Sequence, residues 1–198
     1  MLVRLGQEVQ EVPRRLRAPD PPLTDGVVRL DPMTRADVDD LLRLVEDGAI
    51  REFTLVPTRA GESFVRSWIR GYEDGWKNGG RAGFIVRGAD DGSFVGFASM
   101  FRLDLPAKEG EIGYAVAPAA RGRGAAGRAL ELLTRWGFDD LGLERLELRI
   151  SVTNPASERV AVRGGYRQEG VLRSVHFKEG RRIDVGVWSR LRSDVPNQ

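Results

Sequence analysis

Residues 111–130 read EIGYAVAPAARGRGAAGRAL, and this stretch decides the fold. Residues 111–116 alternate between apolar side chains and charged or small ones, which predicts a half-exposed strand with one buried face. Pro118 ends the strand, and the segment RGRGAA at 121–126 then opens a helix. Unpaired helix N–H groups and the positive end of the helix dipole favour an anion, so this turn predicts a phosphate site.

The same turn also satisfies the dinucleotide-binding pattern G-x-G-x-x-G, with glycines at 122, 124 and 127. Glu147 lies downstream at a distance that suits a ribose contact. However, a parallel Rossmann strand is apolar throughout, whereas this strand is polar on one face. Residues 118–120 also separate the strand from the first glycine, where a Rossmann turn is immediate. A dinucleotide-binding oxidoreductase is therefore the distant alternative.

Written as R-x-x-G-x-A (Arg121, Gly124, Ala126), the turn resembles the acyl-CoA pyrophosphate loop of the GNAT acetyltransferase superfamily, Q/R-x-x-G-x-G/A. A second motif follows a predicted strand at 144–151. Residues 154–166, NPASERVAVRGGY, resemble N-x-x-S-x-x-V-x-x-K-x-G-F, which marks the branch of the RimJ/RimL ribosomal-protein N-terminal acetyltransferases. The resemblance extends over residues 27–191.

This resemblance implies an α/β GNAT fold. Its mixed, mostly antiparallel twisted sheet would have about six to seven strands flanked by helices, with a splayed parallel strand pair holding acyl-CoA. The chain pattern predicts strands at 27–30, 82–86, 94–103, 111–116, 144–151, 166–173 and 183–188. It predicts helices at 34–46, 61–77 and 124–141, and a short helix after Pro155. A capping box at 34–37 opens the first helix. The second helix carries aromatic residues at every fourth position, from Phe64 to Trp76, an aromatic stripe along one face. We expect most of these side chains to lie in the core, although part of the stripe could touch substrate.

The length of 198 residues predicts one domain, assigned to residues 27–193. Residues 1–26 carry four prolines and build a core poorly. We expect them to form an extension that is flexible or lies as an arm on a partner subunit, which would make a homodimer.

The composition argues against several classes of function. The chain has no cysteine and His176 is its only histidine, so we expect no metal site and a cytoplasmic protein. No apolar run approaches the ~18 residues of a membrane span, which argues against membrane association. The net charge is only +2 and the arginines are scattered among acidic residues, so the charge pattern does not indicate nucleic-acid binding.

The resemblance implies transfer of an acyl group from acetyl-CoA, as co-substrate, to an amine. In this mapping the cofactor is bound by the loop residues Arg121, Gly122, Arg123, Gly124, Ala125 and Ala126. The backbone N–H of Val116 would stabilise the oxyanion. Asn154 would hold pantetheine, but it equally suits a helix N-cap, because Pro155 follows at the first helical position.

The resemblance also indicates which residue protonates the departing CoA thiolate. Many GNAT enzymes protonate it with a tyrosine seven residues after the asparagine, where this chain has Ala161. In the RimJ/RimL-like branch a serine three residues after the asparagine takes this role, which here is Ser157. Ser157 is therefore a candidate for both catalysis and cofactor binding. The alternative is a helix-surface serine that bonds its own backbone.

Two residues are candidates for the general base. Glu111 borders the expected cleft, although an exposed strand glutamate paired with an arginine is the alternative. His176 has a suitable ordinary pKa, about 6.5, but a lone histidine beside basic residues also fits plain surface. An α-amino acceptor, with a pKa near 7.7–8.0, would need little help from a base.

The function predicted from the sequence is acyl transfer by direct attack in a ternary complex. The acceptor is a protein N-terminus or a small-molecule amine, and a donor longer than acetyl stays open. A non-catalytic acyl-CoA-binding module is the alternative from another class, because the usual tyrosine is missing.

Overall fold

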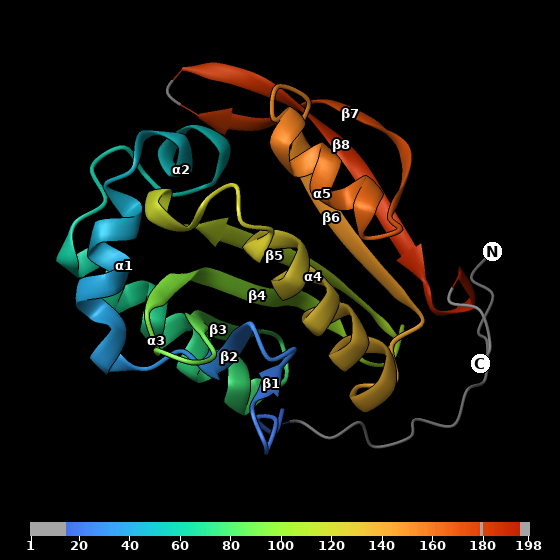
Figure 1. Ribbon diagram of the computed structural model, residues 1–198. Coiled ribbons are helices and arrows are strands. Elements are labelled where there is room, and N and C mark those ends of the chain that lie inside the picture. Colours follow the sequence, from blue (N-terminus) through green and yellow to red (C-terminus); the bar gives the residue numbers. More distant parts are fainter. Residues whose placement is uncertain (1–14, 179, 195–198) are drawn as a thin grey trace.

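The computed structural model of the protein describes residues 15–178 and 180–194. Within these residues one sheet of eight strands runs in the order β1-β2-β3-β4-β5-β6-β8-β7 (Figure 1). The strands are β1 (Leu23–Thr24), β2 (Val28–Pro32), β3 (Ala82–Gly88), β4 (Phe94–Asp104), β5 (Glu109–Val116), β6 (Arg145–Ser151), β7 (Arg167–Lys178) and β8 (Arg181–Leu191). All neighbours are antiparallel except β5 and β6. The predicted GNAT-type α/β fold is confirmed, with the two-residue β1 added to the seven expected strands.

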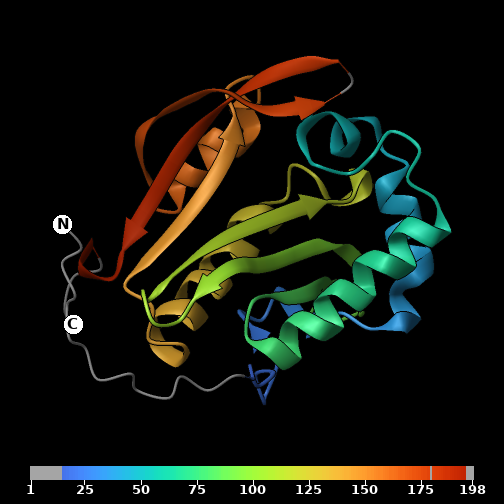
Figure 2. The ribbon, with the colours of Figure 1, turned by 180° about the vertical axis from the view of Figure 1, so that it is seen from behind.

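Helices cover both faces of the sheet. Those of the main body are α1 (Val38–Val45), α2 (Gly48–Phe53), α3 (Glu62–Asn78), α4 (Ala125–Arg135) and α5 (Pro155–Arg163). Short 3-10 turns are η1 (Arg35–Asp37), η2 (Pro118–Ala120) and η4 (Arg192–Asp194), and η3 (Trp136–Asp140) is a π-helical turn that continues α4. One apolar cluster packs α1–α3 on one face and a second packs α4 and α5 on the other (Figures 1 and 2).

The parallel pair β5–β6 is joined over only three positions. Glu109 pairs with Arg145, Gly110 with Leu146 and Glu111 with Glu147. Beyond them β5 continues beside β4 as far as Val116, while β6 continues beside β8 as far as Ser151. The splay predicted from the family resemblance is thus present. The dinucleotide alternative is wrong, because β5 is antiparallel to its other neighbour β4 and lies in a mostly antiparallel sheet, whereas a Rossmann sheet is mostly parallel.

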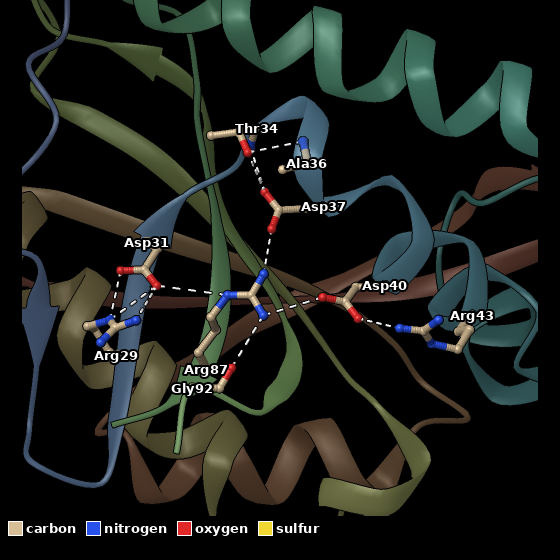
Figure 3. Close-up of polar contacts among 9 residues, drawn as sticks. All are labelled: Arg29, Asp31, Thr34, Ala36, Asp37, Asp40, Arg43, Arg87 and Gly92. Atoms are coloured by element: carbon tan, nitrogen blue, oxygen red, sulfur yellow. Dashed lines mark hydrogen bonds and ion pairs between the residues drawn. The ribbon is translucent and has the colours of Figure 1, made fainter. Parts of the chain in front are cut away.

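A half-buried arginine fastens α1 to the sheet (Figure 3). Arg87 of β3 donates to Asp37 at 2.5 Å and to Asp40 at 3.3 Å. Thr34 and Asp37 form the predicted capping box, in which the backbone N–H of Thr34 donates to the Asp37 carboxylate at 2.8 Å. The same carboxylate therefore caps the helical segment and receives the guanidinium, which fixes the first two helical turns on β3.

We predict that Arg87→Met lowers the free energy of unfolding by about 3 kcal/mol, because it leaves the Asp37 carboxylate buried without its cation. Chemical denaturation measures this loss. Arg43→Met is the matched control, since Arg43 also pairs with Asp40 but its side chain is 69% exposed against 22% for Arg87. A loss of ~0.5 kcal/mol or less is expected for the control. Equal losses in the two variants would contradict the role given to Arg87.

Part of the predicted N-terminal extension packs on the domain. Leu16 is only 5% exposed within the core, and its N–H donates to the carbonyl of Trp76 at 2.9 Å. Asp25 forms an ion pair with Arg128 of α4 at 2.6 Å. These contacts show that residues 15–26 pack on the domain and do not form a flexible arm. The segment adds β1 to the sheet and buries an apolar side chain. Residues 1–14 lie outside the described residues, so the expectation for them stays a prediction.

Candidate active site

A cleft of ≈ 810 Å³ occupies the splay between β5 and β6. Its walls come from α2, α3, β4, β5, the loop into α4, β6, α5, β7 and β8. Every residue singled out from the sequence as catalytic or cofactor-binding lines this cleft except Arg123. The fold therefore brings together the two sequence motifs and both candidate bases.

The backbone of β5 is directed into the splay. The N–H of Ala117 donates to the carbonyl of Val95 at 2.9 Å, so odd-numbered residues at this end bond to β4. Because N–H groups alternate sides along a strand, the N–H of Val116 points away from β4 and toward the diverged β6. It therefore faces the cleft as a polar group without a strand opposite.

The loop before α4 has the geometry of an anion site. Gly122 and Gly124 adopt φ values of +77° and +78°, and an added Cβ at either would meet nothing within 4 Å. Glycine is thus required at these two positions by the left-handed backbone conformation, and not by lack of space for a side chain. The first intrahelical bond runs from Arg128 N–H to the carbonyl of Gly124, and no side chain caps α4 within the described residues. Residues 125–127 consequently present three backbone N–H groups at this end of the cleft.

Arg121 joins this loop to two other elements. Its Nε donates to the carbonyl of Val116 at 3.2 Å, and its guanidinium forms an ion pair with Asp47. Asp47 also caps α2, a helix that the sequence did not predict, by accepting from Ile50 N–H at 3.0 Å. The hydrogen bond from Arg121 lowers the pKa of Asp47. The Arg121 side chain therefore braces the loop against α2 and the end of β5, which leaves the backbone as the principal anion ligand.

The second motif starts α5. The Asn154 side chain accepts from Ser157 N–H at 3.1 Å, with Pro155 as the first helical residue, so the N-cap interpretation is confirmed. A contact from Asn154 to pantetheine stays a prediction, and it would use the amide NH₂ that the cap leaves over. Ser157 lies in the first turn and lines the cleft, whereas Ala161 is fully buried one turn later.

Tyr114 is a site residue that the sequence reasoning missed. It lies on β5 and lines the cleft, and its hydroxyl donates to the Ser157 carbonyl at 3.4 Å. Burial raises the pKa of Tyr114 to about 12, so the phenol keeps its proton at neutral pH. The alternation of β5, which places residue 114 on the face opposite Glu111, was the available signal. A phenol from β5 thus lies beside the first turn of α5.

Glu111 is more enclosed than the sequence predicted. It is only 8% exposed, because Arg102 of β4 and Arg149 of β6 cover it. Arg102 Nη1 lies 3.0 Å and Arg149 Nε 3.3 Å from its Oε2 atom. Burial raises the pKa of Glu111, against the opposing effect of the two arginines. The expected half-exposed strand is therefore wrong at this position, although the pairing with arginine is confirmed.

His176 of β7 is half-buried and lines the same cleft, so the plain-surface interpretation is wrong. Its pKa is lowered by burial, and the charges of Arg102 and Arg149 act in the same direction. Near the mouth, Lys178 of β7 donates to the carbonyls of Arg51 and Thr54 at the end of α2. The β7–β8 hairpin thereby contacts α2 across the cleft.

The aromatic stripe of α3 divides into two parts. Phe64, Trp68 and Tyr72 line the cleft, where Trp68 packs on Phe97 of β4 with ring centroids 4.6 Å apart. Trp76 instead packs in the core against Phe84 and Trp136. The first three rings therefore form an aromatic wall of the cleft.

Two absences hold for the described part of the chain. It contains no group of three or more His, Cys, Asp or Glu side chains that could hold a metal ion. None of its helices is long and apolar enough to cross a membrane.

Residues 28–167 match the family model described as the acetyltransferase (GNAT) domain. The chain belongs to the GNAT family. It is thus an N-acetyltransferase, and its relatives at modest identity include proteins named as ribosomal acetyltransferases. YdaF of Bacillus subtilis (strain 168), whose name places it among ribosomal N-acetyltransferases, is 32% identical over 133 residues, covering 67% of this chain and 69% of YdaF. The ribosomal-protein-serine acetyltransferase of Escherichia coli (strain K12) is 31% identical over 97 residues, or 49% of this chain and 54% of that protein.

Solved structures share this GNAT fold. RimJ of Mycobacterium smegmatis in complex with CoA-disulfide superposes with a TM-score of 0.78 at 23% identity, covering 87% of this chain and 86% of RimJ. Spermidine N-acetyltransferase from Vibrio cholerae, in complex with CoA and spermine, gives a TM-score of 0.76 at 20% identity, covering 86% of this chain and 98% of that one. At these identities the likeness establishes the fold alone.

The uncapped start of α4 leads to a test at Gly127, its third residue, where an added Cβ meets nothing within 4 Å. We predict that Gly127→Asp keeps the fold, because an acidic side chain suits the first turn of a helix. It should weaken CoA binding about tenfold or more, or 1.4 kcal/mol, since its carboxylate would meet the pyrophosphate. Titration calorimetry measures the affinity, and Gly127→Asn provides the control of similar size without the charge. Unchanged affinity in Gly127→Asp would argue against a phosphate site here.

Proposed function

We propose that the protein transfers an acetyl group from acetyl-CoA to a primary amine by direct attack in a ternary complex. The observation that carries this proposal is the splay of β5 from β6. It places the Val116 N–H and the uncapped start of α4 along one cleft. A protein N-terminus or a small-molecule amine would be the acceptor. The relatives named for ribosomal proteins support the first class.

The described residues fit acyl-CoA. The three N–H groups of residues 125–127 would bind the pyrophosphate, with Gly122 and Gly124 giving the backbone its shape. The edge of β5 that faces the splay would bond pantetheine as an added strand would. Acetyl-CoA supplies the reactive thioester when it is bound. The loop residues that were assigned from the sequence act in this proposal mainly through their backbone, while Arg121 braces the loop.

The Val116 N–H would stabilise the negative charge that develops on the thioester oxygen. A preoriented donor is most effective where charge appears in the transition state. The geometry that supports this role is the direction of the N–H away from β4. Arg121 holds the neighbouring carbonyl of Val116 and so fixes the strand end that carries the donor.

Two side chains with hydroxyl groups, Ser157 and Tyr114, line the cleft and would assist the departure of the thiolate. CoA sulfur has a thiol-like pKa of about 8.5, so a hydrogen bond or a relayed proton is sufficient help. Ser157 would donate to the sulfur. Tyr114, which contacts the Ser157 carbonyl, would position the first turn of α5.

Glu111 and His176 would handle the proton of the attacking amine, directly or through a water molecule. A raised pKa brings Glu111 closer to the working pH of a general base. The lowered pKa of His176 keeps its imidazole neutral at pH 7, which also suits a base. A donor longer than acetyl, a homodimer and a cytoplasmic location stay predictions.

The test is release of the CoA thiol from acetyl-CoA in the presence of a panel of primary amines. Turnover with any amine supports the proposal. Specific binding of acetyl-CoA without turnover would favour the non-catalytic module, which the alanine at position 161 also permits.

We further predict that Ser157→Ala lowers kcat and kcat/KM together by about 10²-fold with little change in CoA affinity. Ser63→Ala is the matched control, because Ser63 is also in the first turn of a helix but lies outside the cleft. Tyr114→Phe should give a smaller loss. If Ser157→Ala turns over at the wild-type rate while chemistry is rate-limiting, the hydroxyl has no catalytic role.

A further inference from the structure

The cleft wall opposite the phosphate loop contains a β-bulge. In β4 the residues Arg102 and Leu103 together face the single residue Gly110 of β5, because the register passes from Phe101↔Glu111 to Asp104↔Glu109. Bulges of this kind redirect a side chain and are common beside functional sites. Here the bulge turns the strand where it borders the cleft.

Arg102 occupies the unfavourable position of this bulge. Its φ of +50° lies in the left-handed region, which glycine adopts easily and arginine does not. Strain of this kind persists where the surrounding structure has a use for the residue that bears it. The bulge therefore holds a guanidinium on the cleft wall at a position where glycine would be the relaxed choice.

Arg102 and Arg149 converge on one atom. Both lie against Oε2 of Glu111, Arg102 through Nη1 at 3.0 Å and Arg149 through Nε at 3.3 Å. Arg149 Nε is buried but lacks a hydrogen bond of good geometry, so the contact with Glu111 does not fully satisfy it. The Arg102 side chain is 57% exposed. One carboxylate thus neutralises only part of the charge of two arginines.

The surrounding acids do not remove this excess. Glu147 lies 3.8 Å from Arg149 Nη2, but its Oε1 is bound by Arg145 at 2.6 Å, and Arg145 also pairs with Glu169. Among the described residues that line the cleft, the carboxylates are Glu52 and Glu111, while the cations are Arg102, Arg121, Arg149, Arg163 and Lys178. A polyamine, which carries several positive charges, would meet unfavourable electrostatics here.

We propose that Arg102 and Arg149 form an anion subsite for a carboxylate close to the acceptor's amine. The inference rests on the proposed function and narrows its acceptor. The acceptor is an amino-acid-like amine: a free amino acid, or a peptide N-terminus with an acidic residue nearby. Arginine binds a carboxylate through directed, charge-assisted hydrogen bonds. Glu111 holds the two guanidinium groups in place, and the rings of Phe64, Trp68 and Tyr72 line the same cleft.

The experiment compares matched amines in the acetyl-CoA assay. One pair is alanine and alaninamide, and the other is a C-terminally amidated peptide that begins Ser-Glu or Ser-Gln. Spermidine represents polycations. We expect kcat/KM to be about tenfold higher for the carboxylate member of at least one pair, mainly through KM, and lowest for spermidine. The pair that shows the preference identifies the source of the carboxylate. Calorimetric titration of the same amines into the enzyme saturated with CoA gives a readout without turnover.

Arg102→Gly is the decisive variant, because glycine relaxes the φ of +50° while removing the guanidinium. We expect the relaxed backbone to offset part of the loss of one of the two cations beside Glu111, so that the variant stays folded, and we expect the carboxylate preference to fall to about onefold. Arg102→Lys should keep part of the preference. Arg149→Gln is a second variant with the same expected loss, should Arg102→Gly fold poorly.

The possible outcomes distinguish a failure of the anion subsite from a failure of the proposed acetyl transfer. Equal use of both members of each pair, a preference for spermidine, or an undiminished preference in folded Arg102→Gly or Arg149→Gln would overturn the anion subsite and leave acetyl transfer intact. Absence of turnover with every amine, in an enzyme that binds CoA, would instead overturn the proposed function and this inference with it.

Discussion

The brief pairing of β5 with β6 is the constraint on which the site depends. Three paired positions hold the two halves of the sheet together, and the strands then part. Had the ladder continued, the N–H of Val116 would have been bonded within the sheet and no cleft would separate α4 from α5. The two strands can diverge because each keeps a full antiparallel partner, β4 on one side and β8 on the other. The backbone groups of β5 and β6 that are left unpaired where the strands diverge can form hydrogen bonds with a ligand instead.

The cleft uses different chemistry at its two ends. Toward α4 the polar groups are backbone amides, placed by glycines with positive φ and therefore insensitive to pH. Toward β7 they are side chains, where Glu111, its two arginines and His176 influence one another's charge. This division matches a donor whose chemistry is constant and an acceptor that must be recognised and deprotonated. The positive φ of Arg102 is found at the end that the proposal assigns to the acceptor.

The sequence predicted those parts of the molecule that local rules determine. Gly122 and Gly124 are needed for the backbone of the loop, the capping box at Thr34 starts the first helical turn, and Asn154 caps α5. What it missed depends on contacts between distant segments. The helix α2 is capped by Asp47, whose carboxylate is also tied to Arg121 more than seventy positions away. Period-two alternation distinguishes the faces of β5, but it cannot tell an exposed face from a cleft wall, so the burial of Glu111 and the place of Tyr114 went unrecognised.

The ion pair between Asp47 and Arg121 has a thermodynamic consequence. One carboxylate serves as the cap of α2 and as the counter-ion of the loop arginine. An anion that competes for Arg121 therefore changes the electrostatic environment of the helix whose residues Ala49, Ile50 and Phe53 line the opposite part of the cleft. Coupling of this kind is reciprocal, because the order in which two ligands bind cannot change the total free energy. Through this ion pair, binding of an anion at the loop and binding of a ligand beside α2 would therefore be coupled.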